Sequence, residues 1–188
     1  MDVKIIQEAL SVLKKGGLLL YPTDTVWGIG CDATNEKAVE KVYALKQRAD
    51  SKSLIILADS IAMVERYVRK IPDTAYMLTE VNDKPLTVIY PEAAGLAPNV
   101  VADDGSIAIR IVNHAFCNEL LRQFKRPLVS TSANISGEKT PADFAAISDL
   151  IKQGVDYIVP AAFEQGATRK PSSIIKLGLH NEIQIIRE

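Results

Sequence analysis

The sequence predicts an α/β fold built on a mixed sheet, and three observations support this prediction. Apolar residues switch repeatedly between helical and strand spacing along the 188 residues. Short apolar runs, such as residues 54–57, have the length and composition of buried strands. Helical patterns do not separate every pair of predicted strands, which favours a mixed sheet over a purely parallel one.

The predicted elements follow this alternation in chain order. The strands are short apolar runs bounded by turn residues: 18–21, 27–31, 54–57, 86–90, 107–111, 128–131, 157–159, 173–177 and 183–187. The helices carry apolar residues on one face: 3–14, a segment capped by Thr34 or Asn35 and ending near Lys46, one from Ser60, one after Pro72, 114–124 and 142–152. Ala38, Val42 and Leu45 are expected to face the core.

Length and composition point to a single folded domain, residues 1–188. Hydrophobic residues make up 47% and charged residues 24%, values typical of globular proteins and unlike those of disordered chains. No apolar run reaches the roughly 20 residues of a membrane span, and the N-terminus lacks a secretory signal pattern. We therefore expect a cytoplasmic protein without a membrane partner, with Cys31 and Cys117 reduced and buried.

The standard phosphate-binding motifs are absent, but three polar segments follow apolar runs. Residues 21–28 form a hydroxyl-rich turn between two strands, and residues 130–137 combine four hydroxyls with one amide. Either segment, taken alone, is equally explained as a turn whose side chains bond to local backbone groups. Between them, Lys46 and Arg48 can reach one ligand only if their helix ends there, as the apolar pattern indicates; the alternative is a pair of cations placed favourably at a helix C-terminus.

In this order the segments resemble the YrdC-like family. Seven stretches carry the resemblance: Pro-Thr-Asp-Thr-Val-Trp-Gly at 22–28, Lys-Gln-Arg at 46–48, Pro-Leu-Thr at 85–87, Ile-Ala-Ile-Arg at 107–110, Ser-Ala-Asn at 132–134, Pro-Ser-Ser-Ile-Ile at 171–175, and Ile-Arg at 186–187. Each motif is weak by itself. Their order along nearly the whole chain is specific.

The resemblance implies a twisted open sheet with flanking helices and a concave, basic cavity. It also implies an ATP-using nucleotidyltransferase that joins L-threonine, bicarbonate and ATP into threonylcarbamoyl-AMP and pyrophosphate. That product serves the threonylcarbamoyladenosine modification of tRNA through a separate threonylcarbamoyl transferase. Mg²⁺ is expected to arrive with ATP, no metal ligand is expected from the protein, and tight direct tRNA binding is not expected.

The resemblance also assigns residues, and these assignments are expectations. The catalytic residues are Lys46 and Arg48. The residues expected to contact ATP are Lys46, Arg48, Thr87, Ser132, Asn134 and Arg187. The residues expected to contact threonine are Thr25, Arg110, Ser172 and Ser173. Little covalent work is left to a side chain, so catalysis rests on positioning and charge neutralisation.

The sequence departs from the family pattern at three places, and two other functions compete. Leu57 stands where longer members carry a histidine, Ser53 replaces a common proline, and no glycine precedes Pro85. These departures weaken roles for Lys52 and Lys84. The competing functions are an RNA-binding module with a basic patch at Arg122, Lys125 and Arg126, and a drifted paralogue that binds another nucleotide substrate. The net charge of −1 and the 6% aromatic content disfavour the RNA module.

Overall fold

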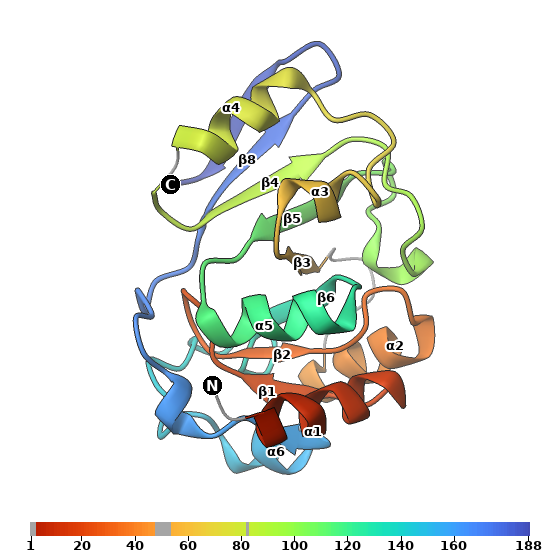
Figure 1. Cartoon of the computed structure of the whole chain (residues 1–188). Helices are drawn as coiled ribbons and strands as arrows, with labels where there is room; N and C mark the ends of the chain where they lie inside the picture. The colour runs from red at the N-terminus through yellow and green to blue at the C-terminus, as the bar shows by residue number, and fades with distance from the viewer. Residues whose placement is uncertain (1–2, 48–53, 82) are drawn as a thin grey trace.

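A mixed sheet forms the centre of the molecule in a computed structural model that describes residues 3–47, 54–81 and 83–188 (Figure 1). Its nine strands run in the order β7-β1-β2-β6-β3-β5-β4-β8-β9. They are β1 (Leu19–Tyr21), β2 (Gly28–Gly30), β3 (Ile55–Ala58), β4 (Leu86–Tyr90), β5 (Ile107–Ile111), β6 (Leu128–Ser132), β7 (Tyr157–Ile158), β8 (Ser173–Leu177) and β9 (Ile183–Arg187).

The sheet contains both parallel and antiparallel pairs, which confirms the predicted mixed topology. The pairs β1–β7, β3–β5 and β4–β8 are parallel, whereas β1–β2, β2–β6, β3–β6, β4–β5 and β8–β9 are antiparallel. The predicted bounds of β4, β5, β8 and β9 are confirmed to the residue, and the other strands differ by one or two residues.

The helices are α1 (Val3–Lys14), α2 (Glu36–Lys46), α3 (Ile61–Val64), α4 (Asp73–Val81), α5 (Ala115–Phe124) and α6 (Asp149–Gln153), with single 3₁₀ turns at Pro98–Val100 and Ala161–Phe163. Helix α1 buries Ile6, Leu10 and Leu13, as predicted, and packs against α5 (Figure 1). It ends at Gly16, whose φ of +71° suits glycine, while the Gly17 N–H donates to the Val12 carbonyl. Within the described ranges, no helix has the length and apolar character to span a membrane.

Helix α2 ends beside the C-terminal end of β6 and places the predicted basic residue Lys46 there, but its buried face differs from the predicted one. The Asn35 side chain caps its first turn by accepting from the Ala38 N–H, and Gln47 ends it in the left-handed conformation. Ala38 and Val42 are buried as predicted, whereas Leu45 is only partly buried. Lys46 is buried instead, with 2% of its surface exposed, because its ammonium finds acceptors inside the fold.

The predicted helix at 142–152 is wrong for its first seven residues. The structure has turns there, and α6 begins only at Asp149. Two contacts explain the difference. Phe144 packs against Trp27 with ring centroids 4.9 Å apart, and the Ser148 hydroxyl accepts from the Ile151 N–H as a new N-cap. Tertiary packing and a local cap thus override the helical spacing of the sequence.

Glycine in β2 is explained by close packing of the first hairpin. A β-carbon on Gly30 would lie 2.4 Å from the Val129 carbonyl and 2.6 Å from the Tyr21 ring. The Tyr21 hydroxyl crosses this space and donates to the Val129 carbonyl at 3.2 Å. The two glycines therefore serve strand packing and leave the adjoining turn, residues 22–27, in place beside β6.

Candidate active site

A cavity of about 360 Å³ gathers residues from segments that are far apart in the sequence. We call it the arginine cavity. Its lining comes from the β1–β2 turn, β3, β5, the end of β6, and β8 and β9. It includes five of the predicted site residues: Thr25, Arg110, Ser132, Ser172 and Arg187. The strand order places these segments together because β5, β4, β8 and β9 are neighbours in the sheet.

The β1–β2 turn is held together by the hydroxyl of Thr23. Its Oγ1 accepts from the Thr25 N–H at 3.1 Å, lies 2.9 Å from Thr25 Oγ1, and donates to the Val26 carbonyl at 2.7 Å. The Thr23 side chain thus stabilises the turn through local hydrogen bonds. Thr23 and Thr25 both line the cavity. The structure therefore confirms the turn explanation for Thr23, while a ligand-binding role for Thr25 stays a prediction.

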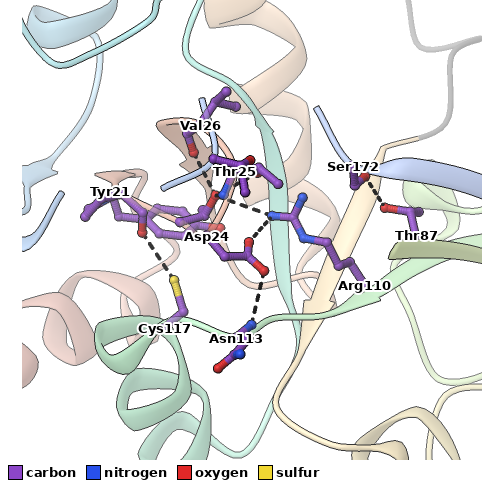
Figure 2. A network of polar contacts seen from close by, with 12 residues as sticks. Tyr21, Asp24, Thr25, Val26, Thr87, Arg110, Asn113, Cys117 and Ser172 are labelled. Carbon is purple, nitrogen blue, oxygen red and sulfur yellow. Dashed lines mark hydrogen bonds and ion pairs between the residues drawn. The ribbon is translucent and has the colours of Figure 1, made fainter. Parts of the chain in front are cut away.

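Arg110 enters the cavity from the centre of the sheet (Figure 2). Its side chain is 6% exposed, and Nη2 lies 3.2 Å from Asp24 Oδ1 and 3.4 Å from Thr23 Oγ1. Asp24 Oδ2 accepts from the Asn113 N–H at 3.1 Å. Within the described residues, the buried Nε of Arg110 has no hydrogen-bond partner. A guanidinium that lines a cavity suits an anionic ligand.

The part of the cavity next to Arg110 comes from β4, β8 and β9, and Thr87 of β4 pairs with Arg110 of β5. Thr87 Oγ1 lies 2.7 Å from Ser172 Oγ, and Arg187 donates to the Ser172 carbonyl from Nε at 3.0 Å and Nη2 at 2.6 Å. Thr87 is fully buried behind Ser172. Ser172 and Ile174 line the cavity, so Ser173 between them points to the other face of the sheet. The structure therefore brings Ser172 to the site and not Ser173.

Lys46 and Asn134 lie at a corner beside the cavity, where they hold the chain after β6. Lys46 Nζ donates to the carbonyls of Ser132 and Asn134, each at 2.6 Å, and the Lys46 carbonyl accepts from the Ser136 N–H. Asn134 Nδ2 donates to the carbonyls of Ile135 and Glu138. Neither Lys46 nor Asn134 lines the cavity, whereas Ser132 does. The predicted residues Arg48 and Lys52 lie outside the described part of the chain.

The arginine cavity is basic although the chain has a net charge of −1. Arg110 and Arg187 line it, and no acidic side chain does within the described residues. Partial burial of the Arg187 side chain lowers its pKa, and the neighbouring Arg110 cation lowers it further. Two guanidinium groups that repel each other in one cavity favour a ligand carrying negative charge.

A second cavity, of about 450 Å³, lies on the other face of the same strands. Its lining alternates with that of the first: Val88, Ile109 and Ile111 face it, whereas Ile89, Ala108 and Arg110 face the arginine cavity. Asp24, Asp59 and Asp83 line this acidic cavity, with Lys84 as its basic residue among those described. Its larger volume does not make it the better site for phosphates, because its charge has the wrong sign.

Metal ligands and thiols offer little alternative chemistry. Across residues 3–47, 54–81 and 83–188, no three histidine, cysteine or acidic side chains form a metal-binding group. Burial raises the pKa of Cys31 and Cys117, and both thiols are buried as predicted. A buried thiol with a raised pKa is a poor nucleophile.

The basic patch considered for RNA is partly neutralised within the protein. Arg122 forms an ion pair with Glu119, and Arg126 Nη1 lies 2.8 Å from Asp32 Oδ2. Lys125 ends helix α5 in the left-handed conformation. These contacts fit the solvated end of a helix, the alternative to a nucleic-acid surface.

Sequence relatives carry one recurring name. A family model called Sua5_yciO_yrdC, described as "Telomere recombination", matches residues 11–188. A threonylcarbamoyl-AMP synthase from Pseudoalteromonas translucida is 35% identical over 92% of this chain and 93% of its own. A threonylcarbamoyl-AMP synthase from Hahella chejuensis is 34% identical over 93% of this chain and 94% of its own.

Solved structures agree with this fold. A Sua5 double variant from P. abyssi superposes with a TM-score of 0.85 at 26% identity, covering 97% of this chain and 55% of that one. P. abyssi Sua5 complexed with L-threonine has a TM-score of 0.79 at 28% identity, covering 92% and 50%. The chain thus spans about half the length of those two proteins. E. coli YciO, at 22% identity and a TM-score of 0.80, shares the fold over 98% of this chain and 89% of its own. From the family match and these relatives, the chain belongs to the Sua5/YciO/YrdC family.

Proposed function

We propose that this chain is a nucleotidyltransferase that makes threonylcarbamoyl-AMP and pyrophosphate from L-threonine, bicarbonate and ATP. The observation that carries the proposal is the convergence of Arg110 and Arg187 with threonine and serine hydroxyls in a cavity whose described lining has no acidic residue. The names of the relatives support it, as does the L-threonine complex of P. abyssi Sua5. Carboxylate and phosphate groups are the ligands that such a cavity favours.

The reaction needs positioning more than covalent catalysis. The neutral amine of threonine adds to bicarbonate, water leaves, and a carbamate forms. A carbamate oxygen then attacks the α-phosphate in line as the bond to pyrophosphate breaks. Negative charge gathers on the carbamate and phosphates throughout, so fixed cations and hydroxyl donors lower the barrier by holding both anions together.

The proposal gives the predicted residues two roles. Arg110, Thr25 and Ser172 line the cavity and are assigned to threonine and its carboxylate. Arg187 and Ser132 are assigned to ATP, which brings Mg²⁺ as a complex with its phosphates. Thr87 acts through the Ser172 hydroxyl.

Lys46 and Asn134 act through the backbone of the loop after β6, where they fix Ser132 and its neighbours. This assignment moves them from direct ligand contact to support of the ATP-binding surface. Arg48 keeps the phosphate contact that the resemblance implies.

Pyrophosphate release tests the proposal directly. The purified protein with ATP and Mg²⁺ is expected to release pyrophosphate only when threonine and bicarbonate are both present, and more slowly with serine. Arg110→Gln is expected to abolish release, whereas Arg122→Gln, outside the cavity and paired with Glu119, serves as the matched control. Pyrophosphate release that does not depend on threonine would contradict the proposal and favour a drifted paralogue with another nucleotide substrate. Salt-sensitive RNA binding without ATP consumption would favour the RNA module.

The wider context belongs to the same proposal. We place the chain in the cytoplasm as one domain, with its labile product passed to a separate threonylcarbamoyl transferase that acts on tRNA. Tight direct tRNA binding is not required for this role, because the modified adenosine is handled by the transferase.

A further inference from the structure

We infer that Asp24 is a positioning residue that holds Arg110 in the orientation needed to bind the substrate carboxylate. The inference deepens the proposed function and rests on it for the identity of the substrate. Asp24 does not line the arginine cavity; it reaches Arg110 from the side of the acidic cavity. Its effect on the reaction would therefore pass through the guanidinium.

The contacts of Asp24 leave it little freedom. One carboxylate oxygen lies 3.2 Å from Arg110 Nη2, and the other accepts from the Asn113 N–H at 3.1 Å (Figure 2). The Thr168 N–H donates to the Asp24 carbonyl at 2.9 Å, which fixes its backbone as well. The Asp24 side chain is 9% exposed. Oδ1 has no hydrogen-bond partner among the described residues, so the Asn113 N–H and the backbone hold Asp24 in place while its charge attracts the Arg110 cation.

The same contacts decide which part of Arg110 remains for a ligand. Nη2 donates to Thr23 Oγ1 and forms an ion pair with Asp24 Oδ1. These contacts restrain rotation of the planar guanidinium and so fix the orientation in which Arg110 lines the cavity. A substrate carboxylate then meets a preorganised donor, which saves the cost of ordering the side chain on binding.

Charge balance gives Asp24 a second reason to be there. Arg110 is buried, and Arg187 in the same cavity has a pKa lowered partly by the Arg110 cation. Without Asp24 the two cations would repel each other with no described acidic side chain in the cavity lining to offset them. Arg110 would then be free to turn toward solvent, away from the orientation that the substrate needs.

A matched control exists elsewhere in the chain. Asp32 is also a buried aspartate paired with an arginine, 2.8 Å from Arg126 Nη1, and it accepts from the Thr34 N–H and hydroxyl. Neither Asp32 nor Arg126 lines either cavity. Asp24→Asn and Asp32→Asn therefore remove the same charge from a buried aspartate that pairs with an arginine. The two pairs differ in their distance from the cavities and in the arginine, since the Arg126 side chain is 55% exposed and that of Arg110 is 6% exposed.

The experiment compares Asp24→Asn, Asp32→Asn and wild type in two measurements. An asparagine at 24 has one acceptor oxygen for two donors, Arg110 and the Asn113 N–H, so it cannot hold both. In ¹⁵N-arginine NMR, the Arg110 Nε–H signal, identified by its loss in Arg110→Lys, is expected to lose exchange protection in Asp24→Asn only. In turnover assays, the same variant is expected to raise KM for threonine roughly tenfold to hundredfold and leave KM for ATP within about twofold.

Each outcome has a separate meaning. An unchanged Arg110 signal in Asp24→Asn would overturn the inference and leave Asp24 a structural partner. The same conclusion would follow if KM for threonine and KM for ATP changed equally in Asp24→Asn and in Asp32→Asn. Absence of threonine-dependent turnover in wild type would overturn the proposed function alone, since the NMR measurement needs no substrate. If Asp24→Asn does not fold, Asp24→Glu replaces it. Asp24→Glu keeps the charge and adds one methylene, so it is expected to shift the Arg110 signal and KM for threonine in the same direction as Asp24→Asn, but by less. An Asp24→Glu variant that behaves like wild type would overturn the inference.

Discussion

Two regions beside the arginine cavity carry predicted site residues but use their cations differently. We call them the corner (the end of α2 and the chain after β6, with Lys46, Ser132 and Asn134) and the wall (β5, β8 and β9, with Arg110 and Arg187). In the corner, the ammonium of Lys46 is directed at two backbone carbonyls. In the wall, both guanidinium groups line the cavity.

The difference shows that a cation named by a motif need not line the cavity. Lys46 holds the carbonyls of Ser132 and Asn134 at 2.6 Å, so it shapes the surface that the cavity presents. Arg110 instead keeps a buried N–H without an acceptor among the described residues. Stability and activity should therefore fall together in the corner and separate in the wall. Four predictions test this contrast.

The largest effect is expected for Lys46→Met. The substitution keeps the length of the side chain but leaves two inward-facing carbonyls without their charged donor, at a cost of about 3 kcal/mol or more. The midpoint of urea denaturation should fall, and pyrophosphate release should drop by at least roughly a hundredfold. Lys46→Arg is the conservative control. Lost turnover at unchanged stability would contradict the comparison and assign Lys46 to direct ligand contact.

A smaller and more selective effect is expected for Arg187→Gln. Arg187 is exposed on the edge strand β9 and donates to the Ser172 carbonyl, so its loss should change the free energy of unfolding by less than about 1 kcal/mol. The affinity for ATP should fall roughly tenfold because one of the two arginines that line the cavity among the described residues is removed. Calorimetric titration with ATP measures this. A stability loss as large as that of Lys46→Met would remove the distinction between corner and wall.

Thr87→Val tests the buried residue of β4 that lies behind Ser172 in the cavity lining. It removes a hydroxyl 2.7 Å from Ser172 Oγ at a fully buried position, with an expected cost of about 1 kcal/mol. Freed from this bond, Ser172 should contact threonine less well and raise KM for threonine a few-fold. Ser172→Ala supplies the reference. If Thr87→Val matches wild type while Ser172→Ala does not, Thr87 has no part in orienting Ser172.

The smallest effect is the pH dependence of stability. It sets the pH range in which the stabilities of the other variants can be compared without a contribution from His114 protonation. Burial lowers the pKa of His114 below 6.5, although its Nε2–H donates to the Phe163 carbonyl at 3.1 Å. The unfolded chain therefore binds a proton that the folded chain does not, so stability is fully present above about pH 6.5 and falls below it. Urea denaturation between pH 5 and 8 should show this slope in wild type and a weaker one in His114→Gln. Equal slopes would exclude His114 as its source.

The sequence alone predicted most of the sheet, because strand composition and spacing are local properties. β4, β5, β8 and β9 have alternating or β-branched residues and end where the pattern ends. Residues 142–148 escaped prediction because the contact of Phe144 with Trp27 joins positions far apart in the chain. No local pattern contains that information.

The site was predicted by motif more than by geometry. The motifs named Arg110, Arg187, Ser132, Ser172 and Thr25, which the structure does gather around one cavity. They did not reveal that Lys46 faces carbonyls or that Ser173 points away, because these depend on helix ends and strand faces. Asp24 lies in the same turn as Thr25. The signal that could have singled it out was a carboxylate, the one acidic residue of residues 21–28, in a segment predicted to contribute to the ligand site.

The strand order has a consequence for folding. Thr23 and Arg110 meet across 87 positions of sequence, and Thr87 and Ser172 across 85, so contacts between distant segments bring the walls of the cavity together. Such topologies close long loops before those contacts form, which slows folding. A helix can form early, but the ligand-binding surface exists only once β5, β4, β8 and β9 have aligned. Recovery of activity after dilution from denaturant should therefore lag behind recovery of helical signal.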